Sequence, residues 1–146
     1  MKTALLDVNV LVALQWPAHE HHDAAHRWYA KQAMRRWASC PLTQLAFVRI
    51  LSNPSVTRDA LSTGHAISLL EKGLAHAAHV FWLDDAPVPS ALKPVAAALH
   101  GHQQLTDAYL LVLAHHRQGT LATFDRGLRT VAGKTFESVI EVVPIR

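Results

Sequence analysis

Apolar and polar positions along the chain predict strands that alternate with helices. Short runs rich in Val, Ile, Leu and aromatic residues have the length and composition of buried strands. Longer segments carry apolar residues three and four positions apart, which is the period of a helix that packs on a sheet. The first predicted strand is a buried run that starts at residue 3 and ends at Asp7. The others cover residues 37–40, 79–83, 120–124 and 138–143.

Residues typical of helix termini mark five helical segments between these strands. Pro17 suits a first helical turn, so we expect a helix from there to about Trp37. Ser62 or Thr63 caps a later helix, and Thr106 is predicted as the N-cap of a helix that Gly119 ends. The predicted helices cover residues 17–37, 41–53, 62–77, 90–101 and 106–119.

This alternation predicts an α/β sandwich built on a mostly parallel sheet. The chain has 146 residues, which is typical of one domain with a substantial core, and we expect that domain to span residues 1–146. No internal repeat, low-complexity segment or linker interrupts the pattern. Pro87, Pro89 and Pro94 predict a stiff loop rather than a domain boundary.

The composition of the chain indicates the cellular environment of the protein and the charge of its binding partner. Half of the residues are hydrophobic and 17% are charged, as in an ordinary soluble globular protein. No apolar run is long enough to span a membrane, and the N-terminus lacks the features of a signal peptide. Cys40 is the single cysteine, so we expect a cytoplasmic protein without an internal disulfide. The formal net charge of +3 suggests an anionic partner.

Three acidic residues stand where open α/β sheets bind their ligands, outside the carboxyl ends of the strands. Asp7 ends the first strand, Asp125 follows the fourth, and Asp107 lies in the first turn of a helix. The helix dipole alone could explain Asp107, and Asp125 could be a helix N-cap. Asp7 has no such simple explanation, because its surroundings are apolar and burial of an unpaired charge is costly.

Three carboxylates at one edge of a sheet would repel each other strongly and require a cation between them. A site built only from oxygen ligands favours Mg²⁺ or Mn²⁺ over zinc. A water held by such an ion can attack a phosphodiester, and the ion also stabilises the charge on the phosphate. The pattern therefore predicts a metal site suited to a nuclease, provided that Asp7, Asp107 and Asp125 converge.

Three segments of the chain resemble the PIN-domain ribonucleases, especially the VapC-type toxins of bacterial toxin–antitoxin pairs. They are LLDVNVLVAL, CPLTQLAFVRILSNP and LTDAYLLVLAHHRQGTLATFDRGL, in the order found in that family. The resemblance implies a PIN-like three-layer α/β/α sandwich with a mostly parallel five-stranded sheet. It also implies a Mg²⁺- or Mn²⁺-dependent endoribonuclease with an RNA substrate, a homodimer, and a cognate antitoxin that covers the active site.

The resemblance assigns catalytic and metal-binding roles to Asp7, Asp107 and Asp125. Side chains next to these positions are expected to hold the site in place, as partners of metal ligands commonly do. These expected supports are Asn9, Thr43 and Thr123, and the candidate phosphate contacts are Arg126, Arg129 and Arg49. For Arg49, one helical turn beyond the site, a structural role is an equal alternative.

One candidate catalytic position departs from the family pattern. Many relatives have Glu where this chain has Gln44. The amide offers a neutral carbonyl oxygen, but it cannot act as a general base. We therefore expect weaker metal binding and less support for a second metal ion.

The residues leave other functions open. One alternative is a non-catalytic PIN-like domain with a weakened site that binds RNA or a protein partner. A phosphatase with an Asp nucleophile would need a second acid where Asn9 stands, and a receiver domain would need its acid at the end of a middle strand. After the middle strands the only acids are Asp84 and Asp85, which lie in a loop. The sequence therefore disfavours both the phosphatase and the receiver domain.

Two further groups of residues have an ordinary and a functional interpretation. Arg27, Lys31 and Arg35 recur every four residues and form either a solvent-exposed helix face or a contact to phosphates. Tryptophans can stack on RNA bases. The four are Trp16, Trp28, Trp37 and Trp82; we expect Trp82 in or near the core, and Trp28 and Trp37 in helix packing or a dimer contact more than in base stacking.

Overall fold

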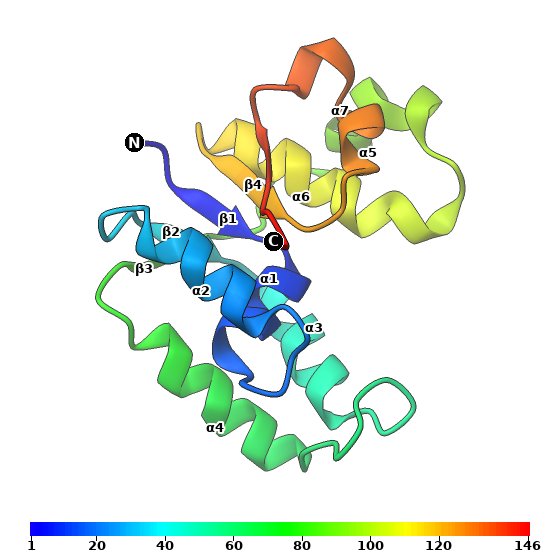
Figure 1. Cartoon of the computed structure of the whole chain (residues 1–146). Coiled ribbons are helices and arrows are strands. Elements are labelled where there is room, and N and C mark those ends of the chain that lie inside the picture. The colour runs from blue at the N-terminus through cyan, green and yellow to red at the C-terminus, as the bar shows by residue number, and fades with distance from the viewer.

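The computed structural model describes residues 1–146, and a sheet of five parallel strands lies at its centre (Figure 1). The strands are β1 Ala4–Leu6, β2 Trp37–Ser39, β3 His79–Phe81, β4 Thr120–Thr123 and β5 Ile140–Val142. Their order in the sheet is β3-β2-β1-β4-β5, and every neighbouring pair is parallel. The carboxyl ends of all strands therefore meet at the same edge of the sheet.

Helices cover both faces of this sheet and complete the predicted α/β/α sandwich, which is thereby confirmed (Figure 1). One layer consists of α1 Val8–Gln15, α2 His22–Ala30, α3 Pro41–Ser52 and α4 Thr63–Leu74. The other consists of α5 Val88–Leu92, α6 Leu105–His116 and α7 Leu128–Phe136, with the 3₁₀ helices η1 Lys93–Ala98 and η2 His102–Gln104.

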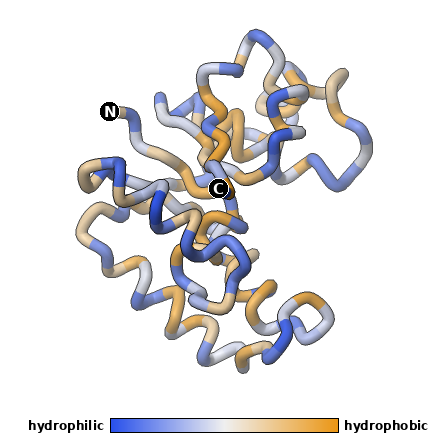
Figure 2. The backbone as a smooth tube through the Cα atoms, viewed as in Figure 1, coloured by the Kyte–Doolittle hydropathy of each residue, from blue (hydrophilic) through white to orange (hydrophobic).

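The hydrophobic core is divided between the two faces of the sheet. Successive side chains of a strand point to opposite faces, so Leu5 packs with α6 and α7, whereas Leu6 packs with α1 and α3. Figure 2 shows hydrophobic backbone segments gathered around the sheet, with hydrophilic segments in the outer loops. Burial on both faces explains why the strand sequences are almost continuously apolar.

Strand β1 ends before Asp7, as predicted, but the helix that follows it is not predicted by the pattern. The backbone carbonyl of Asp7 accepts the amides of Val10 and Leu11, so α1 starts immediately after the strand. The eight residues of α1 are almost all apolar, and four of them are buried. A continuous apolar run has no period that distinguishes a buried helix from a buried strand.

The single helix predicted over residues 17–37 is wrong. Pro17 lies in a turn, α2 covers only His22–Ala30, and Trp37 already belongs to β2. The chain leaves the helix through Ala33 and Met34, which have positive φ angles of 52° and 58°. No glycine or proline marks this left-handed turn, so the sequence carries no signal for it.

The predicted helix boundaries elsewhere are partly confirmed. Ser62 caps α4, because its hydroxyl accepts the amide of His65 at 3.1 Å. Thr106 is not an N-cap: a 3₁₀ turn leads directly into α6, and Gln104 takes the cap position. Pro94 falls where the predicted helix over residues 90–101 changes into η1. Helix α7 is a further element that the pattern does not predict.

Arg35 is buried and lies beyond the end of α2, so the expectation of an exposed helix face is wrong for this residue. Its side chain is 6% exposed and forms an ion pair of 2.8 Å with Glu141, which follows Ile140 in β5. Trp28, Trp37 and Trp82 are buried, as predicted. None of the helices has the length and apolar character needed to cross a membrane.

Candidate active site at the carboxyl edge of the sheet

Asp7 lies at the carboxyl end of the central strand and is almost completely buried, with 4% of its surface exposed. Its Oδ1 atom accepts the amide of Val8 at 2.7 Å, and its Oδ2 atom accepts the hydroxyl of Thr123 at 2.8 Å. Burial raises the pKa of Asp7, and the nearby charge of Asp125 acts in the same direction. The two hydrogen bonds oppose this rise, because they stabilise the ionised carboxylate.

Thr123 ends β4 beside Asp7 and connects it to the third acid. Its buried hydroxyl oxygen accepts the amide of Asp125 at 3.0 Å. The Asp125 side chain is exposed, and its Oδ1 atom accepts the amide of Gly127 at 2.8 Å. Asp125 therefore stabilises the turn that leads from β4 into α7. Its carboxylate lies near Asp7 but is hydrogen-bonded within that turn.

Asp107 lies in the first turn of α6 and is half-buried. Burial raises its pKa to about 7, and the charges of Asp7 and then Asp125 add to the rise. The three acids come from β1, α6 and the end of β4, and their ionisations oppose one another. The structure thus brings the three predicted acids to one edge of the sheet, within range of mutual electrostatic repulsion.

The three carboxylates have the chemistry of a site for a hard divalent cation, but they are not gathered into a finished ligand set. No three His, Cys, Asp or Glu side chains are spaced closely enough to enclose a metal ion as they stand. Asp7 is fixed by two hydrogen bonds, whereas Asp125 is exposed and held only through Gly127.

The amide nitrogen of Gln44 is engaged at the end of the neighbouring strand β2. Its Nε2 atom donates to the hydroxyl of Ser39 at 3.0 Å, and that hydroxyl also contacts Nε2 of His79 at 2.8 Å. Gln44 makes no hydrogen bond with Asp7, Asp107 or Asp125. The carbonyl oxygen of its amide is left without a hydrogen-bond partner.

The expected supports differ in what they contact. Thr123 bonds directly to Asp7, whereas the hydroxyl of Thr43 accepts the amide of Cys40 at 3.0 Å and thus stabilises the start of α3. Asn9 is exposed on the first turn of α1 and makes no side-chain hydrogen bond to the acids. A supporting role for Asn9 and Thr43 would therefore have to act without direct contact to a carboxylate.

The three candidate phosphate contacts are exposed arginines. Arg126 and Arg129 follow Asp125 at the start of α7, and Arg49 lies on α3. None of them forms an ion pair, since the three ion pairs of the structure involve other residues. Their guanidinium groups are therefore available to an anionic ligand.

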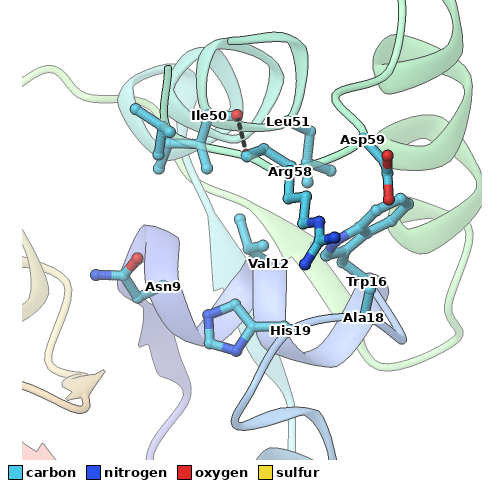
Figure 3. A pocket seen from close by; sticks show the side chains of 11 residues that line it. Asn9, Val12, Trp16, Ala18, His19, Ile50, Leu51, Arg58 and Asp59 are labelled. Carbon is cyan, nitrogen blue, oxygen red and sulfur yellow. Dashed lines mark hydrogen bonds between the residues drawn. The ribbon is translucent and has the colours of Figure 1, made fainter. Parts of the chain in front are cut away.

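A cleft of about 360 Å³ runs along α1, between that helix, the loop after it and the end of α3 (Figure 3), and none of the three acids lines it. Asn9 lies at one end, Trp16 and His19 form part of the wall, and Arg58 extends into the space from the loop between α3 and α4. Of these residues, Asn9 and Trp16 stand out in the sequence. His19 begins the histidine-rich segment HEHHD at residues 19–23, whose pattern fails that of a zinc site, and Arg58 lies in a loop without a motif.

The chain is similar to known proteins over most of its length. The PIN domain family model matches residues 4–134, which include Asp7, Asp107 and Asp125. Ribonuclease VapC39 of Mycobacterium tuberculosis is 41% identical over 138 residues, which are 94% of this chain and 99% of that protein. Ribonuclease VapC38 of the same organism is 39% identical over 142 residues, covering 97% and 99% of the two chains. Ribonuclease VapC44, also from this organism, is 40% identical over 129 residues, covering 88% and 90%. This chain therefore belongs to the PIN-domain family and, within it, to the VapC-type ribonucleases.

Proposed function

We propose that this protein is a Mg²⁺- or Mn²⁺-dependent endoribonuclease, formed by one PIN-like domain over residues 1–146, and that it acts as the toxin of a toxin–antitoxin pair. The observation that carries the proposal is the position of Asp7, Asp107 and Asp125 at the carboxyl edge of the sheet, where the hydroxyl of Thr123 contacts both Asp7 and the backbone of Asp125. Relatives with about 40% identity are named ribonucleases, which supports RNA as the substrate. Three acids that oppose each other's ionisation form a site that a divalent cation would stabilise.

Each acid has a distinct part in this proposal. Asp7 is the fixed ligand, because its hydrogen bonds to Val8 and Thr123 leave the carboxylate little freedom. Asp107 holds a proton near neutral pH without the ion and releases it when the ion is bound. Asp125 completes the set from its exposed turn. A bound divalent cation would activate a water and stabilise charge on the scissile phosphate.

Cleavage of RNA in the presence and absence of metal tests this function. We expect the parent protein to cut single-stranded RNA with Mg²⁺ or Mn²⁺ and to stop cutting in EDTA. We expect Asp7→Asn and Asp107→Asn each to reduce the cleavage rate at least about 100-fold. This exceeds the effect of losing a residue that only positions a metal ligand. Glu71→Gln, a similar change at an exposed position of α4, should cut like the parent. Cleavage that is insensitive to EDTA, or that proceeds at the parental rate in Asp7→Asn, would contradict the proposal.

The alternative function is a non-catalytic domain that binds RNA or a partner. Gln44 favours it to a limited degree, because the amide adds no negative charge and its nitrogen is bonded to Ser39. The same experiment separates the two functions. RNA that binds but stays intact with every divalent metal would identify the binding domain.

Two protein partners belong to the proposal. A cognate antitoxin would cover the acids, as the VapC-type toxin role requires. A homodimer is supported by exposed apolar side chains on the edge strand and neighbouring helices, among them Leu45, Ile67 and Phe81. Sedimentation equilibrium should give twice the monomer mass of 16.1 kDa. A monomer at all concentrations would contradict the dimer without affecting the ribonuclease proposal.

A further inference from the structure

We propose that the cleft along α1 is a subsite for one unpaired nucleotide of the RNA, with the base between Trp16 and His19 and a phosphate at Arg58. The inference rests on the proposed ribonuclease function and specifies how the substrate is held. It concerns residues outside the acidic site, which come from two loops and the end of α1.

Two residues of the cleft lie next to segments that carry the acids. Asn9, at one end of the cleft, follows Asp7 by two residues on the first turn of α1. His19, in the wall, lies nearly parallel to Phe124, with ring centroids 6.3 Å apart and an interplanar angle of 19°. Phe124 directly precedes Asp125. An RNA strand with its scissile phosphate at the acids would therefore place a neighbouring nucleotide in this cleft.

The walls are suited to a flat, apolar ring. Trp28, Trp37 and Trp82 are buried, and Trp16 is the one tryptophan with a partly exposed ring. The ring of His19 is held in place because its Nδ1 atom accepts the amide of His21 at 2.9 Å. Burial and the neighbouring His21 lower the pKa of His19, which keeps the ring neutral at pH 7. Fixed neutral aromatic rings are the surfaces on which proteins stack unpaired bases.

Arg58 supplies a positive charge without a partner of its own. Its side chain forms no ion pair and no hydrogen bond, and Figure 3 shows its guanidinium extending into the cleft near Trp16 and above His19. The loop that carries it is fixed to α3, because Thr57 donates its hydroxyl to the carbonyl of Ile50 and Leu61 donates its amide to that of Leu51 at 2.8 Å. A guanidinium held over a cleft is a typical ligand for phosphate oxygens.

The remaining polar groups also fit a nucleotide. Asn9 and Asp59 stand at the rim and offer an amide and a carboxylate, which can form hydrogen bonds with the edges of a base. The volume of about 360 Å³ is within the range of sites for small ligands. One cation, two aromatic rings and polar rim groups match a single nucleotide better than a purely apolar anchor of a protein.

Binding of RNA in EDTA tests the subsite without any contribution from metal or cleavage. The probe is a fluorescein-labelled, mixed-sequence single-stranded RNA of about ten nucleotides, within the usual site sizes of such proteins. We expect Arg58→Ala to weaken binding roughly tenfold and to reduce the slope of log K against log salt by about 0.7, the value for one lost phosphate contact. Trp16→Leu should weaken binding roughly tenfold with the slope unchanged, because it removes stacking but no charge.

Two control variants make the comparison specific. Lys72→Ala removes one exposed positive charge from α4, and Val88→Ala removes one exposed apolar side chain from α5. Both should bind RNA within about twofold of the parent, as expected for residues that make no contact. RNA should also quench the tryptophan fluorescence of the parent, and this quenching should be lost in Trp16→Leu. Thermal melts of all variants establish that each one is folded.

The outcomes separate this inference from the function on which it rests. If the parent cuts RNA but Arg58→Ala and Trp16→Leu match its affinity and salt slope, the subsite is wrong and the ribonuclease proposal stands. If these variants keep their affinity for RNA but lose binding of the antitoxin, the cleft belongs to the protein partner and the inference is overturned. A parent protein that neither binds nor cuts RNA would overturn both proposals.

Discussion

Thr123 donates its hydroxyl to Oδ2 of Asp7 at 2.8 Å, although 116 positions separate the two residues in the chain. The same hydroxyl oxygen accepts the amide of Asp125 at 3.0 Å. The contact with Asp7 arises because β4 pairs directly with β1 in the parallel sheet, whereas the contact with Asp125 is local to the turn after β4. One buried hydroxyl thus holds the most buried acid of the candidate site and positions the backbone of another.

Thr123→Val should lower both stability and activity. Valine has nearly the same shape but no hydroxyl, so the buried carboxylate of Asp7 loses one hydrogen bond. Loss of one partner of a buried polar group costs about 1–3 kcal/mol, which urea unfolding at neutral pH would measure. The pKa of Asp7 should rise further, because the lost bond favoured its ionised form. Thr123→Ser keeps the hydroxyl and should stay close to the parent; equal losses in both variants would show that shape, not the hydroxyl, matters.

Ionisation of Asp107 should destabilise the metal-free protein as the pH rises. Its pKa increases from the ordinary value of 3.8 to about 7 in the folded protein. Between these values the unfolded chain has released the proton and the folded chain has kept it, so stability falls with increasing pH. Asp107→Asn should therefore melt at a higher temperature than the parent above about pH 7 in EDTA, with little difference near pH 4. A difference of the same size at both pH values would contradict this explanation.

Gln44→Glu tests whether residue 44 belongs to the metal site. A carboxylate in place of the amide adds one negative charge near the other three acids. We expect Mn²⁺ to bind at least several-fold more tightly, in line with the dependence of metal affinity on the number of charged ligands. Calorimetric titration with Mn²⁺ would measure the change. Unchanged affinity would place the side chain with Ser39 and His79, outside the reach of the ion.

The buried pair of Arg35 and Glu141 should matter for folding and not for metal binding. Arg35 is 6% exposed and also donates to the carbonyl of Lys2 at 2.6 Å and to the hydroxyl of Thr120 at 2.9 Å. Arg35→Met removes the cation, while Glu141, which is 26% exposed, keeps the hydrogen bonds from Trp28 and Thr120, so we expect a loss of about 1–3 kcal/mol. Urea unfolding should show this loss, whereas Mn²⁺ affinity of the folded variant should equal that of the parent. A variant as stable as the parent would assign the pair no structural role.

The sequence predicts the layers of the fold and the positions of the three acids for a physical reason. Carboxyl ends of parallel strands meet at one edge, so Asp7 and Asp125 must be neighbours once β1 and β4 are recognised as strands of one sheet. Helix α1 was beyond prediction because its apolar residues lack a distinguishing period. The end of α2 was equally hidden, since Ala33 and Met34 adopt positive φ angles that their residue types do not indicate.

Side-chain partners that depend on tertiary structure were also beyond prediction. Arg35 belongs to a basic stripe in the sequence, and only the pairing of distant segments shows that Glu141 neutralises it. Gln44 occupies the expected place at the start of α3. Its hydrogen bond to Ser39 forms because Ser39 is the last residue of β2, which lies next to this turn of the helix. Arg58 reaches the cleft because hydrogen bonds fix its loop to α3, which no local pattern indicates.

A crystal structure of the protein grown with Mn²⁺ would show whether the acids share a cation. We expect one strong anomalous peak at the carboxyl edge of the sheet, within about 2.2 Å of carboxylate oxygens of Asp7 and Asp107, with the Asp125 side chain rotated toward it. Crystals of Asp7→Asn grown in the same way should lack the peak. A fully occupied Mn²⁺ ion bound elsewhere, or no ion at the three acids at saturating Mn²⁺, would contradict the metal site from which the nuclease function is argued.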